Sequence, residues 1–252
     1  MYKSYIIIGS KGLLGKQLVK LLKKKNAKVI SVHKKNYNKK KNSSADVLIN
    51  ANGNSNKFFA NSYPFKDFRQ SFLSVYKTLL DFKFKKYIYI SSGDVYQFQG
   101  DASTDEKKNI KSPKNFYGKN KHLAEIFIQY YCSNWLIFRM GPMIGVGLKK
   151  NAVFNIKNNK FVFENIETQS SFINSFNVAK IVNTINKKFT NEIFNLSGKG
   201  VVSLKYIKKK FNSSSLFDNN KKKKIYHLKI NKILKYAVVP KTINEIKKFS
   251  KV

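Results

Sequence analysis

A strand-length run of apolar residues, Tyr5–Ile8, leads directly into three glycines spaced three apart, Gly9, Gly12 and Gly15. The segment that follows, Leu13–Lys25, places apolar side chains at helical spacing. In such a strand–glycine–helix unit, the first glycine permits a tight turn, the second lets the backbone approach a diphosphate, and the third lets the helix pack on the sheet. The free N–H groups of the helix N-terminus then face the phosphates. The predicted phosphate-binding residues are Gly9, Ser10, Lys11, Gly12, Leu13, Leu14 and Gly15.

Strand-like and helix-like segments alternate along most of the chain. Further strands are expected at Lys28–Val32, Asp46–Asn50, Lys86–Ile90, Trp135–Phe138 and Glu192–Leu196, and further helices at Phe65–Phe82, Phe116–Cys132 and Asn177–Lys187. This alternation predicts an α/β protein with a Rossmann-like, doubly wound parallel sheet and right-handed crossovers.

The regular alternation of strand and helix patterns ends after Gly147, and shorter elements are expected beyond it. Val153–Phe163 has the pattern of a helix followed by a strand, Ser171–Asn174 that of a short edge strand, and Leu204–Phe211 that of a helix. We therefore expect a small C-terminal substrate-binding lobe beside the Rossmann domain. The domain is assigned residues 1–142 plus about 172–198, and the lobe about 143–171 plus 199–252.

The formal net charge is +37, from 50 basic against 13 acidic residues. Such a charge suits nucleic acid, a membrane surface or an anionic ligand. It also suits compositional drift, since Lys, Asn and Ile are abundant while arginine occurs only at positions 69 and 139. Nucleic-acid readers rely on arginine, and the lysines here are dispersed, so drift is favoured and nucleic acid is an unfavoured partner. The segments Lys34–Ser44 and Asn212–Lys224 are predicted to be solvated loops rather than binding tails.

Several features bear on the cellular compartment. No apolar run is long enough to span a bilayer, and a strand beginning near Tyr5 leaves no room for a signal peptide. Cys132 is the single cysteine, so no internal disulfide can form, and the three histidines lie too far apart in sequence for a metal site. We therefore expect a cytoplasmic protein with no membrane partner and no metal.

The end of the second expected strand bears on cofactor choice. In dinucleotide-binding units an acidic residue there binds the ribose hydroxyls of NAD, whereas a basic one suits the 2′-phosphate of NADP. Here the strand runs into His33, Lys34 and Lys35 with no carboxylate nearby. NADP is therefore predicted, with NAD as the alternative, and His33 and Lys34 are predicted cofactor contacts. Because lysine is common throughout the chain, the missing carboxylate is the more informative observation.

A hydroxyl, a phenol and an ammonium occur at positions suited to proton transfer. Tyr117 and Lys121 are four residues apart in an expected helix and share one of its faces. An ammonium beside a phenol lowers the phenol pKa, which makes tyrosine a usable acid or base. Ser92 ends an expected parallel strand, where ligands of open α/β sheets bind.

Together these fragments resemble the extended short-chain dehydrogenase/reductase superfamily, specifically the NAD-dependent epimerase/dehydratase group that acts on nucleotide sugars. The resemblance runs from Tyr5 to about Leu204 and is carried by Gly-x-x-Gly-x-x-Gly, Ser-Ser-x-x-Val-Tyr and Tyr-x-x-x-Lys motifs. It implies that Ser92, Tyr117 and Lys121 are catalytic, with Lys121 also binding the nicotinamide ribose. Further predicted contacts are Ala51, Asn52, Gly53 and Pro142 for the cofactor, together with Tyr117 and Lys121, and Ser92, Gly93, Asp94 and Tyr117 for the substrate.

The chain also departs from the group's pattern. Dehydratases of the group have two acidic residues after the catalytic hydroxyl, whereas this chain has Gly93 and Asp94, which disfavours dehydration. Asp94 has two open roles, an auxiliary acid or a surface or capping residue. Pro142 stands where members often have Asn, and Gln169–Ser171 replace an arginine that binds the nucleotide diphosphate. A smaller or different substrate is therefore an alternative.

The resemblance predicts an NAD(P)-dependent oxidoreductase or epimerase that reduces or epimerises a nucleotide-linked sugar by hydride transfer, with Tyr117 as acid/base. The NADP-like strand end favours reduction slightly. The alternative is a non-catalytic NADP-binding sensor or assembly subunit of the same fold. A homodimer through the Tyr117 helix is a possible assembly, because it is common in the superfamily.

Overall fold

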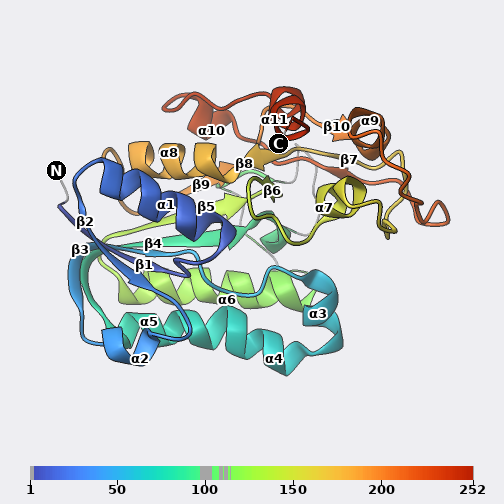
Figure 1. Ribbon diagram of the computed structural model, residues 1–252. Helices are drawn as coiled ribbons and strands as arrows, with labels where there is room; N and C mark the ends of the chain where they lie inside the picture. The colour runs from blue at the N-terminus through green and yellow to red at the C-terminus, as the bar shows by residue number, and fades with distance from the viewer. Residues whose placement is uncertain (1–2, 97–103, 108–109, 111–112, 114, 252) are drawn as a thin grey trace.

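The computed structural model describes residues 3–96, 104–107, 110, 113 and 115–251, which are built around a six-stranded sheet (Figure 1). The strand order is β2-β1-β3-β4-β5-β9, and every neighbouring pair is parallel. The strand order reverses between β1 and β3. In open α/β sheets ligands bind at such a reversal, in the crevice outside the carboxyl ends of the strands. The predicted doubly wound sheet is confirmed. Its strands are β1 (Ser4–Ile8), β2 (Lys28–Val32), β3 (Ser44–Asn50), β4 (Lys83–Ser92), β5 (Trp135–Met140) and β9 (Glu192–Leu196).

Helices cover both faces of the sheet because its strands are apolar on both sides. Successive strand side chains point to opposite faces, so Ile7 and Ile49 pack in one core cluster while Ile6 and Leu48 pack in the other. Figure 1 shows α1 and α8 above the sheet and α3 to α6 below it. The bounds are α1 (Leu13–Lys24) and α8 (Ser175–Asn186) above, and α3 (Lys57–Ser62), α4 (Pro64–Phe68), α5 (Ser74–Asp81) and α6 (Phe116–Tyr131) below.

Two predicted segments differ in the structure. The single helix expected over Phe65–Phe82 is divided by a π-helical turn, Arg69–Leu73, between α4 and α5. The loop expected over Lys34–Ser44 contains a short helix, α2 (Tyr37–Lys40). Tyr37 anchors it, because its ring packs edge-on against Phe82 at 5.5 Å between centroids and its hydroxyl donates to Asp81 at 2.8 Å. The segment is largely exposed, as predicted, and differs from the prediction only in containing this short helix.

Short elements from the C-terminal part of the chain pack beside the sheet and have an apolar cluster of their own, which includes Ile156, Ile207 and Ile246. The strand expected at the end of Val153–Phe163 is reduced to one bridge between Val162 and Phe217. The division into domain and lobe stays a prediction. The elements are β6 (Met143–Ile144), α7 (Ala152–Lys157), β7 (Gln169–Ser170), β8 (Ile173–Asn174), β10 (Val202–Ser203), α9 (Leu204–Lys210), β11 (Ile225–Tyr226), α10 (Asn231–Leu234) and α11 (Thr242–Phe249).

One charged side chain is buried at the end of the upper helix layer. Lys86 of β4 donates through Nζ to the carbonyls of Asn186 (2.9 Å) and Phe189 (2.5 Å), at and just beyond the end of α8. These carbonyls have no partner within the helix, so the lysine satisfies them. Burial lowers the pKa of Lys86 to about 8.

This lowered pKa predicts a pH-dependent contribution to stability. The folded state releases the Lys86 proton at lower pH than the unfolded state, so the contribution of Lys86 is largest above about pH 10 and is lost as the pH falls through about 8. We expect the free energy of unfolding of the wild type, minus that of Lys86→Met, to rise between these pH values. Urea unfolding of both proteins across this range measures the difference. A difference that does not change with pH would contradict the prediction.

Candidate active site

The glycine turn after β1 has the backbone geometry that the sequence predicts. Gly9 has a positive φ of 78°, and its carbonyl accepts from Gly12 N at 2.8 Å. A Cβ on Gly9 would lie 2.8 Å from the Ala51 carbonyl oxygen, and a Cβ on Gly15 would clash with the Gly9 carbonyl. The turn therefore lies against the loop after β3, at the switch point of the sheet.

The same turn offers donors to an anion. The buried Ser10 hydroxyl has no hydrogen-bond partner among the described residues. Lys11 and Gly12 are exposed at the start of α1, while Leu14 is buried beneath it. A free hydroxyl beside a helix N-terminus suits a phosphate oxygen. The residues present therefore fit the diphosphate of a dinucleotide.

A basic rim lies beside this turn at the end of β2. Partial burial and the charges of Lys11 and Lys35 together hold the pKa of His33 below its ordinary value, so the two lysines lie close enough to His33 to act on it electrostatically. Lys34 is exposed next to them. Ala51, Asn52 and Gly53 form the loop that follows β3, and Ala51 and Asn52 lie against Gly9 of the glycine turn.

Ser92, Tyr117 and Lys121 are brought together at the carboxyl edge of the sheet. Ser92 is the last residue of β4 and accepts from Asp94 N at 3.2 Å, which starts a 3₁₀ turn, Gly93–Val95. The first turns of α6 carry Tyr117 and Lys121, and all three side chains are buried. A Cβ on Gly118 would clash with the Asp94 carbonyl, so α6 packs directly on the 3₁₀ turn.

The pKa of Tyr117 shifts in the direction opposite to the one expected from the sequence. Burial raises it, the charges of Asp94 and Asp67 raise it further, and a hydrogen bond with Ser92 opposes them. Lys121 Nζ stands over the aromatic rings, 5.9 Å from the Tyr117 centroid and 5.1 Å from that of Tyr89. Burial also lowers the pKa of Lys121 to about 8. The expectation of a lowered phenol pKa was wrong, because burial is the largest influence on it and disfavours the charged phenolate.

Asp94 is neither a surface residue nor a simple cap. It is buried, accepts from Ser92 Oγ at 3.2 Å and forms an ion pair with Lys57 of α3. Lys57 Nζ lies 5.1 Å from the ring centroid of Tyr226 in β11. Lys57 and Tyr226 were missed in the sequence. The position of Lys57 shortly after β3, at the carboxyl edge, was the available signal, whereas Tyr226 had none.

Leu228, just after β11, packs on the carboxyl edge of the sheet near Gly93 and Gly141. Leu228 packs so closely on Gly93 that a Cβ there would lie 2.7 Å from its Cδ2, and a Cβ on Gly141 would lie 3.7 Å from its Cδ1. Gly93 is therefore buried under an apolar side chain. Pro142 is exposed just beyond β5, and its carbonyl accepts from Ile173 N at 3.2 Å. The structure thus ties Pro142 to β8.

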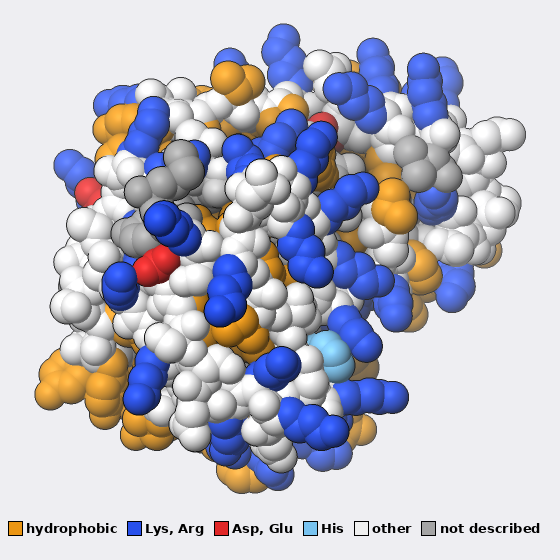
Figure 2. Space-filling model, turned by 60° about the vertical axis from the view of Figure 1, so that its left-hand side comes forward, with side chains coloured by type: hydrophobic (Ala, Val, Ile, Leu, Met, Phe, Trp, Pro, Cys, Tyr) orange, Lys and Arg blue, Asp and Glu red, His pale blue; other side chains and the backbone are white. Residues whose placement is uncertain are grey.

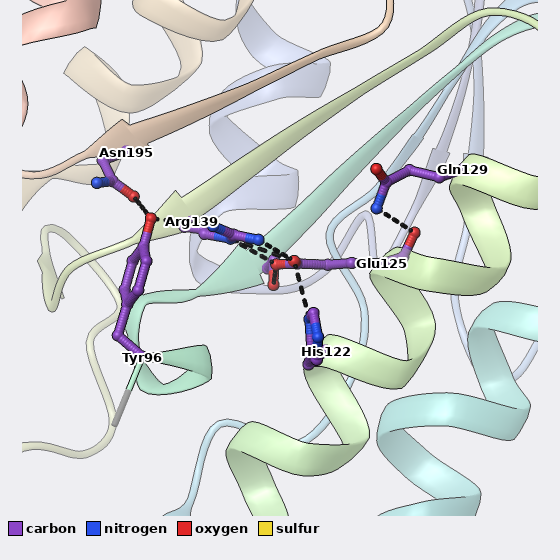
Figure 3. A network of polar contacts seen from close by, with 7 residues as sticks. Tyr96, His122, Glu125, Gln129, Arg139 and Asn195 are labelled. Atoms are coloured by element: carbon purple, nitrogen blue, oxygen red, sulfur yellow. Dashed lines mark hydrogen bonds and ion pairs between the residues drawn. The ribbon is translucent and has the colours of Figure 1, made fainter. Parts of the chain in front are cut away.

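A buried polar network supports the site from within (Figure 3). Arg139 of β5 donates to both oxygens of Glu125 in α6, with Nη2 2.7 Å from Oε2, and to the Tyr96 hydroxyl at 3.0 Å. Tyr96 in turn donates to Asn195 of β9 at 2.8 Å. Ser91, next to Ser92, donates to Glu125 at 2.5 Å. The network connects α6, the helix that carries Tyr117 and Lys121, to the three strands β4, β5 and β9.

The distribution of surface lysines, the possible metal ligands and the lengths of the helices bear on nucleic-acid binding, metal binding and membrane insertion. Figure 2 shows lysines scattered over one face with apolar and neutral areas between them, rather than gathered in one block. No group of three or more His, Cys, Asp or Glu side chains in the described part of the chain could hold a metal ion. Within the same residues, none of the helices is long and apolar enough to cross a membrane.

No family model matches the sequence, and no curated protein matches it either. The structure is similar to solved structures over nearly its whole length. A dTDP-4-dehydrorhamnose reductase from Bacillus anthracis str. Ames, in complex with NADP, matches with a TM-score of 0.81 at 18% identity, covering 99% of this chain and 98% of that one. A UDP-galactose 4-epimerase gives 0.82 at 15%, covering 98% and 97%. MoeE5, in complex with UDP-glucose and NAD, gives 0.85 at 11%, also covering 98% and 97%.

At these identities the likeness concerns the fold. The chain has the fold of these nucleotide-sugar reductase and epimerase structures. The resemblance seen in the sequence motifs therefore extends to the complete architecture, including the C-terminal elements that the motifs do not reach.

Proposed function

We propose that the protein is an NADP-dependent oxidoreductase that reduces a nucleotide-linked ketosugar. One observation carries the proposal: the Ser92 hydroxyl, the Tyr117 phenol and the Lys121 ammonium are all buried at the carboxyl edge of β4, with Lys121 Nζ 5.9 Å from the centroid of the Tyr117 ring. The glycine turn with the free Ser10 hydroxyl follows β1, at the same carboxyl edge of the sheet, and β3 separates β1 from β4. The similar structures of a reductase and an epimerase support the same class of reaction.

The roles of the side chains follow from their positions. A bound NADP molecule supplies the hydride chemistry. The raised pKa keeps Tyr117 protonated at neutral pH, so its phenol donates a proton to the oxygen of the reduced carbonyl. Ser92 donates a hydrogen bond to the same oxygen, while Lys121 holds the nicotinamide ribose and stabilises the phenolate that forms. The same three side chains serve an epimerase, in which the proton returns to Tyr117.

The basic rim supports NADP over NAD. The charges of Lys11 and Lys35 act on His33 at the end of β2, where a 2′-phosphate lies in dinucleotide-binding folds. The reductase of similar structure was crystallised with NADP and MoeE5 with NAD, so the fold takes both cofactors. The rim is the feature of this chain that favours the phosphorylated one.

We also include a homodimer in the proposal. Leu80 of α5 and Ile126 and Tyr130 of α6 are large apolar side chains with 64%, 48% and 83% of their surface exposed. A second copy packed on these helices would remove them from water.

The test follows NADPH oxidation over a panel of nucleotide-linked 4-ketosugars, with the wild type and Gly12→Val. A Cβ on Gly12 would already lie 3.1 Å from the Gly9 carbonyl oxygen, so a valine side chain would crowd the turn that is proposed to bind the diphosphate. We expect consumption by the wild type and loss of dinucleotide binding in Gly12→Val. Lys20→Val, which places the same side chain on an exposed position of α1, is the matched control and should bind normally.

Wild-type protein that consumes no NADPH but inverts sugar stereochemistry, as seen by NMR, would replace reduction by epimerisation. If the wild type shows neither reduction nor epimerisation over the panel, both reactions are contradicted and a non-catalytic dinucleotide-binding protein is supported. Normal dinucleotide binding by Gly12→Val would refute the phosphate turn.

A further inference from the structure

A fully buried carboxylate lies next to the candidate catalytic residues. Asp67 of α4 accepts at Oδ1 from Asn54 Nδ2 (2.8 Å) and Ser71 Oγ (2.9 Å), and at Oδ2 from Asn120 Nδ2 (2.7 Å). All three donors are neutral. In the described part of the chain, no ion pair neutralises this carboxylate. Burying a charge is costly, so a carboxylate kept here without an ion pair calls for a nearby charge to balance it.

Lys121 is a buried cation on which the charge of Asp67 acts. It follows Asn120 directly on α6 and is itself buried, with 3% of its surface exposed. Its Nζ lies over the rings of Tyr89 and Tyr117, and a Cβ on Gly53 would lie 3.0 Å from it. An ammonium among aromatic rings is poorly solvated and loses its proton easily. Burial is the main influence on its pKa and lowers it, and the charge of Asp67 is the first influence that raises it again.

Two irregular backbone segments, a π-helical turn and the loop after β3, supply hydrogen-bond donors to the Asp67 carboxylate. Ser71, one of its donors, lies in the π-helical turn Arg69–Leu73 that divides α4 from α5. Such turns insert one extra residue into a helix and are frequent at functional sites. Asn54, another donor, follows the loop after β3 that carries Gly53. Asp67 is thus connected, through Asn54, to the loop whose Gly53 lies beside Lys121 Nζ.

We propose that Asp67 is a positioning residue that keeps the Lys121 ammonium protonated and directed toward the carboxyl edge of β3 and β4. The proposal rests on the function given above, in which Lys121 holds the nicotinamide ribose and stabilises the Tyr117 phenolate. Asp67 touches neither cofactor nor substrate and acts through Lys121.

The other charged and titratable groups around Lys121 do not fill this role. Glu125 of α6 also favours the ammonium, but it forms an ion pair with Arg139 of β5. Asp94, in the 3₁₀ turn, acts on Tyr117 and is paired with Lys57 of α3. The pKa values of Tyr89 and Tyr117 are raised, so both phenols are neutral at neutral pH. Of the two described carboxylates that act on Lys121, Asp67 is therefore the one without its own cation.

The experiment titrates Lys121 directly, by ¹³C NMR of protein labelled at the lysine ε-carbon, with the resonance assigned by its loss in Lys121→Met. In the wild type the titration midpoint is expected at about 8. Asp67→Asn retains the size of the side chain and removes the charge, so the midpoint is expected to fall by about one pH unit. The control is Asp46→Asn, which neutralises a carboxylate bound to Lys3, Ser4 and Lys85 at the opposite end of the strands and should leave the midpoint unchanged.

A second measurement covers the case in which Asp67→Asn is too unstable to titrate. If the two charges balance one another, Lys121→Met should reverse part of the stability loss caused by Asp67→Asn, and urea unfolding of both single variants and the double variant measures this coupling. The proposal would be overturned, even in an active enzyme, if the Lys121 titration midpoint did not move in Asp67→Asn. It would equally be overturned if the stability losses of Asp67→Asn and Lys121→Met simply added up in the double variant. A shifted midpoint in a protein that turns over no sugar would uphold the Asp67–Lys121 coupling and refute the proposed function.

Discussion

Tyr117→Phe is expected to lower turnover by a factor of about 10² to 10⁴ while leaving dinucleotide affinity nearly unchanged. The substitution removes one oxygen and keeps the ring on which Lys121 rests, 5.9 Å from the centroid. The phenol is the proton donor of the proposed reaction, so a substrate oxygen that gains charge has no acid beside it in the variant. NADPH oxidation measures turnover, and quenching of protein fluorescence by added NADPH measures binding.

Tyr89→Phe is the matched control for this prediction. Tyr89 lies on β4, and its ring also supports the Lys121 ammonium, at 5.1 Å. Its hydroxyl is buried and has no hydrogen-bond partner among the described residues, so the variant keeps the ring and removes an oxygen without a role in proton transfer. Turnover by Tyr89→Phe should stay close to the wild-type value. Unchanged turnover in Tyr117→Phe would remove Tyr117 from the mechanism.

The parts of the fold and site that the sequence predicts are those set by local backbone chemistry. Gly9 has a positive φ, and a side chain at Gly15 would clash with the turn, so both positions require glycine for reasons contained within seven residues. The pairing of Tyr117 with Lys121 follows from helical spacing, and the place of Ser92 from the end of a strand. These features can be inferred from short segments because few other residues take part in them.

The features that the sequence does not predict depend on residues far apart in the chain. Lys57 meets Asp94 and Tyr226 only after three separate segments have packed together. The buried state of Asp67 depends on Asn120, 53 positions away. The direction of the Tyr117 pKa shift has the same origin, because the burial that raises it is produced by tertiary packing, whereas spacing along α6 shows only the nearby lysine.

The Glu125–Arg139 ion pair is the other feature with a large expected effect. Both side chains are nearly inaccessible to water, with 0% and 3% of their surfaces exposed. Although burial raises the pKa of Glu125, the His122, Arg139 and Ser91 side chains together hold it below its ordinary value, so the carboxylate is charged at neutral pH. A buried pair of this kind is costly to break, because the remaining partner keeps its charge in a place that water does not reach.

Glu125→Gln is therefore expected to lower the free energy of unfolding by about 3–5 kcal/mol, as measured by urea unfolding. Glu167→Gln, which breaks an exposed pair with Lys205, should change it little and is the control. A double variant, Glu125→Met with Arg139→Leu, removes both charges and should recover part of the loss, though not all of it, because Ser91 and Tyr96 lose their partners. A loss as small in Glu125→Gln as in the control would contradict the prediction. α6 also carries Tyr117 and Lys121. We therefore expect turnover to fall together with the free energy of unfolding in Glu125→Gln, and both to recover in the double variant. Such parallel changes would show that the Glu125–Arg139 pair fixes α6 against β5 for catalysis.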